Sequence, residues 1–156
     1  MSETLEAGSP APAFAVPANG GGTVSLAALK GRKVVLYFYP KDDTPGCTTE
    51  AIDFTARLAD FTAAGASIVG VSRDSVAAHD KFAAKHGLGI VLGADTDGAV
   101  TEAYGVWVEK MNYGRKYFGI ERSTFLIGAD GRIARIWRKV KVKGHVDEVL
   151  AAAQAL

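Results

Sequence analysis

Residues 33–50 read KVVLYFYPKDDTPGCTTE and carry the clearest indication of the fold class. Its first seven residues are mostly β-branched or aromatic and show no alternation, which is typical of a strand buried on both faces of a sheet. Pro40 ends that strand. After the loop, apolar side chains recur at spacings of four and three, which predicts a helix closed by Gly65 and carrying the stripe Cys47, Ala51, Phe54, Leu58 and Phe61. The stretch therefore predicts a buried strand joined by a short loop to an amphipathic helix.

The rest of the chain continues this alternation of strands and helices. Ser67–Val71 is typical of a second buried strand, and the next helix begins after Ser75 as its cap and stops at Gly87. Further elements are expected in the order strand 90–92, helix 97–104, strands 123–127 and 133–137 around an Asp130-Gly131 turn, and helix 145–153. This order predicts one α/β domain over residues 1–156, a three-layer sandwich with a central mixed sheet.

Composition and charge exclude several functional classes. Eighteen basic and seventeen acidic side chains give a net charge of +1, which provides no electrostatic footprint for nucleic acid or an anionic membrane. The densest basic run, Arg138 to Lys143, alternates with valines and is interpreted as the solvated face or edge of a strand. No secretory signal and no apolar stretch of ~20 residues is present, so the expected location is the cytoplasm.

The chain has one cysteine, Cys47, which excludes an internal disulfide and any Cys-x-x-Cys redox or zinc site. Cys47 follows the predicted strand at its carboxyl end, where active sites of open α/β sheets collect. It also lies in the first turn of the predicted helix, where free N–H groups and the helix dipole favour the reactive thiolate. Pro40 and Pro45 restrict the loop, and Thr44 can place its hydroxyl beside the sulfur. The alternative is that Cys47 is only a small buried hydrophobic residue.

The segment Pro40-Lys-Asp-Asp-Thr44-Pro-Gly-Cys47-Thr-Thr-Glu50 resembles the peroxidatic loop of the peroxiredoxins, whose pattern is Pro, three residues, Thr or Ser, two residues, Cys. The residues of this segment are similar to those of the bacterioferritin-comigratory, or Q-type, branch of that family. The resemblance covers nearly the whole chain, including segments 11–14, 69–72, 104–107 and 122–127. It implies a thioredoxin-like fold and a thiol-dependent peroxidase that needs no metal or other cofactor.

The resemblance also implies roles for individual residues. Cys47 is expected to be the peroxidatic cysteine, with the Thr44 hydroxyl contacting sulfur and peroxide and Arg122 as the cation beside the thiolate. Pro40 is expected to shield the substrate site from water, and Gly46 to lie in that site. The alternative for Arg122 is a surface ion pair with either of two acidic residues, Glu121 or Asp130.

The sequence departs from the family where many relatives keep a resolving cysteine. Those positions are occupied by Ile52 and, in the next predicted helix, Ala83. An outside thiol, from thioredoxin, glutaredoxin or a small molecule, must then reduce the oxidised Cys47, which is a one-cysteine mechanism. The Q-type resemblance implies a monomer. A redox-sensing or binding module without significant turnover is the alternative function.

The remaining polar and aromatic candidates carry weaker expectations. His79, His86 and His145 show no metal-ligand spacing and are interpreted as surface residues. Asp42 and Asp43 are expected to do no more than solvate the loop. Two aromatic residues have open assignments, either at the mouth of the site or in ordinary packing: Tyr104 and Trp107.

Overall fold

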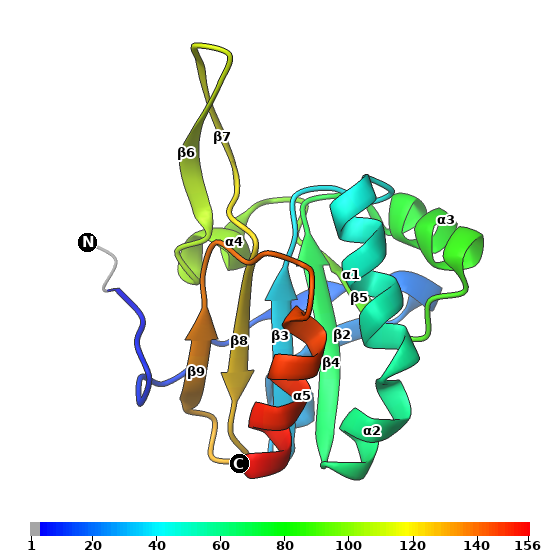
Figure 1. Ribbon diagram of the computed structural model, residues 1–156, viewed down its shortest axis with the longest axis vertical. Coiled ribbons are helices and arrows are strands. Elements are labelled where there is room, and N and C mark those ends of the chain that lie inside the picture. The colour runs from blue at the N-terminus through cyan, green and yellow to red at the C-terminus, as the bar shows by residue number, and fades with distance from the viewer. Residues whose placement is uncertain (1–3) are drawn as a thin grey trace.

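A computed structural model describes residues 4–156 of the chain and shows a central five-stranded mixed sheet (Figure 1). Its strand order is β5-β4-β3-β8-β9. The first three of these strands are mutually parallel, whereas β8 runs antiparallel to both β3 and β9. The strands are β3 (Lys33–Phe38), β4 (Ala66–Ser72), β5 (Val91–Ala94), β8 (Ser123–Ile127) and β9 (Ile133–Trp137). The predicted α/β class with a mixed sheet is confirmed.

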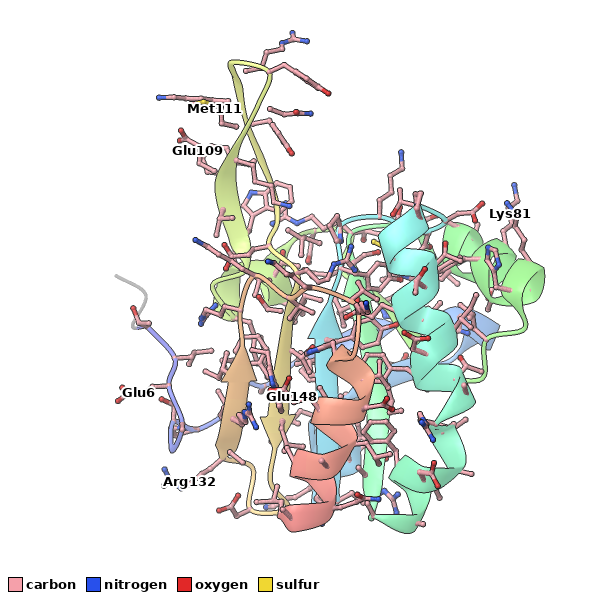
Figure 2. All side chains as sticks on the ribbon, in the orientation of Figure 1. Glu6, Lys81, Glu109, Met111, Arg132 and Glu148 are labelled. Carbon is pink, nitrogen blue, oxygen red and sulfur yellow. The ribbon has the colours of Figure 1, made fainter. Side chains whose placement is uncertain are left out.

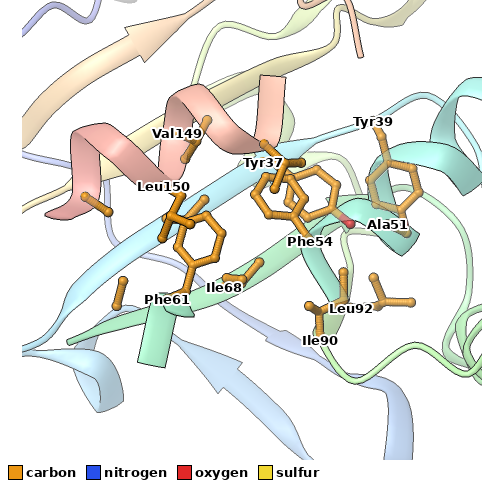
Figure 3. Packing of buried hydrophobic residues seen from close by; sticks show 14 of the residues in the cluster. Tyr37, Tyr39, Ala51, Phe54, Phe61, Ile68, Ile90, Leu92, Val149 and Leu150 are labelled. Carbon is orange, nitrogen blue, oxygen red and sulfur yellow. The ribbon is translucent and has the colours of Figure 1, made fainter. Parts of the chain in front are cut away.

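Helices cover one face of this sheet (Figure 1). They are α1 (Pro45–Ala56), α2 (Leu58–Ala63) and α5 (His145–Ala155), with α3 (Val76–His86) beside them near β5. An aromatic core lies between the helices and the sheet, where the rings of Tyr37 and Phe54 stack with centroids 4.6 Å apart (Figure 3). The single helix predicted from Cys47 onward is divided in two, because Arg57 leaves helical geometry at φ −103° and ψ 8°.

The opposite face is covered by a different set of elements. These are the antiparallel ribbon of β1 (Ala15–Pro17) and β2 (Thr23–Ser25), two 3-10 turns and the short helix α4 (Ala99–Ala103). Phe14, Phe38, Tyr104 and Phe125 form the aromatic centre of this second core. The sheet is therefore buried on both faces, as its unalternating strand sequences predict.

The local signals around α3 and β8–β9 are confirmed. The Ser75 hydroxyl accepts a hydrogen bond from the backbone N–H of Ala78 at 3.1 Å, and Gly87 ends α3 in the left-handed conformation at φ 62°. Strands β8 and β9 pair antiparallel across the turn that contains Asp130 and Gly131. These features depend on neighbouring residues only, which explains why the sequence pattern predicts them.

A two-stranded hairpin that the sequence analysis did not anticipate projects from the body of the molecule (Figure 1). It consists of β6 (Trp107–Asn112) and β7 (Arg115–Ile120), and the side chains of Glu109 and Met111 extend from it (Figure 2). Met111 is 66% exposed and Tyr113 at the tip is 97% exposed. Because both faces of the hairpin are largely exposed, its sequence lacks the apolar alternation that marks a half-buried strand.

Two predictions about polar residues are wrong. The basic segment after β9 is a loop rather than a strand, because Lys139 adopts a left-handed φ of 49° and the N–H of Val140 bonds to the carbonyl oxygen of Arg122. His79 and His145 are buried rather than exposed. Each makes a hydrogen bond to a buried partner, which compensates for the loss of solvent. No helix in residues 4–156 has the length and apolar character required to cross a membrane.

Candidate active site

Cys47 lies at the edge of the sheet where β3 ends and α1 begins. Pro45 starts the helix, Thr44 precedes it in an extended conformation, and the N–H of Thr48 bonds to the Thr44 carbonyl oxygen at 2.8 Å. The Cys47 residue is only 2% exposed and packs against the aromatic core. The sulfur is thus held at the N-terminal turn of a helix and is almost completely buried.

Arg122 is the cation beside the sulfur. It directly precedes β8, and the pairing of Phe38 with Ser123 brings it next to the end of β3. Its Nη2 donates a hydrogen bond to Cys47 Sγ at 3.3 Å, although the two residues are 75 positions apart in the sequence. The acidic partner of Arg122 is Glu50, so the alternative of a surface pair with Glu121 or Asp130 is wrong. Its role in catalysis remains a prediction, but its position agrees with the expected one.

Glu50 is the site residue that the sequence analysis missed. Its Oε1 accepts a hydrogen bond from Arg122 Nη1 at 2.8 Å, and the residue has no exposed surface. Burial raises the pKa of Glu50 to about 7, although Arg122 acts in the opposite direction. Glu50 lies one helical turn from Cys47, on the same face of α1. A carboxylate on the apolar face of an amphipathic helix was the signal that could have identified it.

The charges around Arg122 further stabilise its protonated form. Burial by itself lowers the pKa of Arg122, but the charges of Glu50 and Cys47 and their hydrogen bonds outweigh it and leave the pKa raised. Glu50 Oε2 and the Tyr37 hydroxyl are buried without a hydrogen-bond partner among residues 4–156. Arg122 is therefore a fixed cation beside the sulfur, and the carboxylate of Glu50 is incompletely hydrogen-bonded.

Gly46 provides the space that Arg122 occupies. A Cβ atom at this position would lie 3.1 Å from Arg122 Nη2, which is closer than most side-chain contacts permit. The absence of a side chain at Gly46 thus allows the guanidinium to reach the sulfur. The expected contact between Gly46 and substrate stays a prediction.

Thr44 and Pro40 lie in the loop before α1. The Thr44 hydroxyl donates to the Lys41 carbonyl oxygen at 2.8 Å, so its proton is directed to the loop rather than to the sulfur. Its oxygen lone pairs remain available to accept from a peroxide O–H. Pro40 is exposed. The predicted contact of Thr44 with substrate and the shielding by Pro40 both stay predictions.

Lys110 adds a second cation near the site, contributed by the projecting hairpin. Its Nζ donates to the carbonyl oxygen of Ile120. Burial and the nearby Arg122 lower the pKa of Lys110, and Cys47 acts in the opposite direction. Within residues 4–156, no three His, Cys, Asp or Glu side chains are grouped so that they could hold a metal ion. Two cations, Arg122 and Lys110, therefore lie near the thiol.

The positions without a resolving cysteine lie on α1 and α3. Ile52 is 42% exposed, on the outer side of the helix whose inner side carries Cys47. Residues five apart on a helix are ~140° apart around its axis, which explains the difference. Ala83 on α3 packs partly buried against the core.

The two aromatic residues with open assignments lie in different surroundings. Tyr104 is buried in the second core, whereas Trp107 stacks under the guanidinium of Arg73 at 3.4 Å.

Comparison with known proteins gives consistent results. The sequence model of the AhpC/TSA family matches residues 7–136. The chain is 53% identical to Peroxiredoxin Bcp of Xanthomonas campestris over 148 residues, which cover 94% of this chain and 92% of the relative. A PrxQ cysteine-to-serine mutant of Xylella fastidiosa superposes with a TM-score of 0.92 at 40% identity and covers 99% of this chain and 98% of its own.

A further solved structure carries information about activity. The bacterioferritin comigratory protein of Xanthomonas campestris, described for its alkyl peroxide reduction activity, superposes with a TM-score of 0.87 at 51% identity. The match covers 91% of this chain and 90% of that one. The thioredoxin-like arrangement expected from the sequence is confirmed by these structural neighbours.

Proposed function

This chain belongs to the AhpC/TSA family and is similar to Bcp or Q-type peroxiredoxins, and we propose that it is a thiol-dependent peroxidase reducing hydrogen peroxide and organic hydroperoxides. The observation that carries the proposal is the contact of Cys47 Sγ with Arg122 Nη2 at 3.3 Å, at the first turn of a helix. An inert core cysteine has no need of a partly buried cation directed at its sulfur.

The reaction is a displacement at oxygen. The Cys47 thiolate attacks the terminal oxygen of the hydroperoxide, so a sulfur–oxygen bond forms as the oxygen–oxygen bond breaks. Cys47 becomes a sulfenic acid, and the departing oxygen takes a proton and leaves as water or an alcohol. Negative charge moves from sulfur to the departing oxygen during this step. Arg122 and the backbone N–H groups of the first turn of α1 can stabilise that charge because they are already in place.

The sulfenic acid is recycled by an external thiol. With one cysteine in the chain, no internal disulfide can form. A reductant thiol therefore condenses with the sulfenic acid, giving a mixed disulfide and water, and a second thiol releases Cys47 and an oxidised disulfide product. Thioredoxin, glutaredoxin and small thiols fit this requirement. The resemblance to Q-type proteins supports a monomer, and a reducing cytoplasm would supply the thiols.

Peroxide titration followed by intact-mass measurement tests this function. Hydroperoxide consumption is measured with dithiothreitol as reductant for the wild type and for Cys47→Ser, which should be inactive although folded. Without reductant, one equivalent of peroxide should add one oxygen to the wild type and make it reactive with dimedone. Excess peroxide should add a second oxygen, since nothing in the chain resolves the sulfenic acid. Wild-type turnover by Cys47→Ser, or no turnover by the wild type, would contradict the proposal.

A further inference from the structure

A buried acid–base pair links the loop before Cys47 to helix α3. Asp42 Oδ2 lies 2.6 Å from His79 Nδ1, and the Tyr39 hydroxyl donates to Asp42 Oδ1 at 2.6 Å. The side chain of His79 is 0% exposed and that of Asp42 is 5% exposed. The two residues are 37 positions apart in sequence, so this contact depends on the packing of α3 against the loop. Neither residue takes part in the proposed chemistry at the sulfur.

The hydrogen bonding of His79 is complete at both ring nitrogens. Nε2 lies 2.9 Å from the carbonyl oxygen of Gly93, which can only accept, so Nε2 carries a hydrogen. One proton then lies between Nδ1 and the Asp42 carboxylate. Gly93 belongs to β5, so His79 connects the loop to the sheet as well as to α3. Such a fully satisfied buried network specifies one geometry, because displacing any member leaves a buried polar atom unpaired.

The backbone of Asp42 is held as well. Its N–H donates to Asp74 Oδ2 at 2.9 Å, and the same oxygen accepts from the Ser72 hydroxyl at 2.6 Å. Ser72 is the last residue of β4. Asp42 is thus fixed through side chain and main chain, to elements that differ from the helix carrying the sulfur.

The next residue shows why this fixation is needed. Asp43 has a φ of 60°, a left-handed conformation that non-glycine residues seldom adopt. Such a conformation persists only where the surrounding structure imposes it. The ion pairs of Asp43 with Lys85 and His86 are exposed, with 43% of the Asp43 side chain accessible, so they contribute little. The buried contacts of Asp42 are therefore the stronger restraint on this turn.

We propose that Asp42 and His79 are positioning residues for the proposed peroxidase reaction: they fix the loop so that Thr44 and the first turn of α1 hold Cys47 against Arg122. The link is short, because Lys41 accepts the Thr44 hydroxyl and Thr44 accepts the first backbone hydrogen bond of α1. A displaced Asp42 therefore moves Thr44 and the first turn of α1, and with them the sulfur relative to Arg122. This chain has no resolving cysteine at Ile52 or Ala83, so its cycle contains no step in which α1 must unwind to form an internal disulfide.

The test compares two reactions of the same thiol in His79→Gln, Asp42→Asn and the double variant. Stopped-flow oxidation of Cys47 by hydrogen peroxide depends on the placed donors, whereas alkylation by iodoacetamide needs only an accessible thiolate. Each variant should lower the peroxide rate about tenfold or more, since small displacements at a reacting centre have large effects. The iodoacetamide rate should stay constant or rise. The double variant should be no slower than the slower single variant, because the two residues act as one unit.

His86→Gln is the matched control. His86 is on the same helix and bonds to the same loop at 2.9 Å through exposed Asp43, and its replacement should leave both rates unchanged. Circular dichroism and thermal melting establish that each variant is folded. If His79→Gln does not fold, Tyr39→Phe removes one hydrogen bond to Asp42 and should lower the peroxide rate about two- to fivefold.

The outcomes separate this proposal from the proposed function. Folded variants that keep the wild-type ratio of peroxide to iodoacetamide rates would overturn the positioning role alone. A peroxide rate and an iodoacetamide rate that fall by the same factor would be such a result, because they would show a general loss of thiol reactivity. A wild type that does not react with peroxide would instead overturn the proposed function, and the positioning role with it.

Discussion

An ion pair between a carboxylate and an arginine lies at each end of helix α1, and the two pairs differ in how far their side chains are exposed to solvent. Near the N-terminus, Glu50 pairs with Arg122 at 2.8 Å, with side chains 0% and 16% exposed. At the C-terminal end, Arg57 pairs with Asp147 of α5 at 3.1 Å, with side chains 48% and 66% exposed. Both pairs connect α1 to an element far away in sequence.

The two pairs differ in energetic contribution because water can solvate the charges of an exposed pair but not those of a buried one. An exposed pair contributes about 0–1 kcal/mol, because solvent screens the charges and solvates either residue alone. In a buried pair, removal of one residue leaves the other charge without solvent, which costs about 3–5 kcal/mol. A buried pair is therefore a poor means of stabilising a helix, and its presence beside Cys47 indicates a use for the charge itself. Three variants test this comparison.

The largest effect is expected for Arg122→Ala. Loss of the guanidinium removes the hydrogen bond to Cys47 Sγ and the charge that we propose stabilises the transition state, so kcat/KM for hydroperoxide should fall on the order of 10²-fold or more. The free energy of unfolding should fall too, because Glu50 is left buried without its cation. Peroxide kinetics and urea unfolding measure the two effects. A variant with wild-type kcat/KM would show that the cation has no part in the reaction.

An intermediate effect is expected for Glu50→Gln, which should change how the free energy of unfolding depends on pH. The pKa of Glu50 is about 7 in the folded protein against a reference of 4.5, so its contribution to stability is complete below about pH 4.5 and is lost as pH rises through 7. Between these values the free energy of unfolding of the wild type should decrease by an amount on the order of 3 kcal/mol.

Glutamine does not titrate, so Glu50→Gln should lack this decrease. Urea unfolding of both proteins from pH 4 to 8 gives the comparison. His145, whose pKa burial lowers to about 4, is common to both proteins and cancels in the difference. Parallel stability curves would mean that folding does not shift the pKa of Glu50, because the charge of Arg122 balances the effect of burial.

The smallest effect is expected for Arg57→Ala. Its partners Asp60 and Asp147 are both more than half exposed, so water replaces the lost contacts. The free energy of unfolding should change by less than about 1 kcal/mol, and kcat/KM should not change. A loss comparable to that of Arg122→Ala would remove the distinction between the two ends of the helix.

Much of the fold was predictable because its signals are local. The buried strand before Pro40, the helical stripe from Cys47, the Ser75 cap and the Gly87 stop all depend on residues a few positions apart. The hairpin of β6 and β7 was missed because it buries neither face. The segment from Arg138 to Lys143 alternates like a strand, but one left-handed residue and a bond to Arg122 make it a loop.

The site was predictable in part. The loop pattern identified Cys47, and the family resemblance identified Arg122, which the structure brings within 3.3 Å of the sulfur. Glu50, Asp42 and His79 were assigned no function or were placed at the surface. Polar residues are normally exposed, and that expectation fails where a specific partner compensates for burial.

Local sequence patterns account for the five strands of the central sheet, the main helices and the position of a lone cysteine at a strand-to-helix junction, and the composition excludes an internal disulfide partner. Which charges are buried and which groups face the sulfur depends on tertiary contacts. The physical reason is distance along the chain: secondary structure depends on neighbours within a helical turn or a tight turn. The contacts of Asp42 with His79 and of Glu50 with Arg122 instead join residues 37 and 72 positions apart, and they exist only once the sheet has brought those residues together.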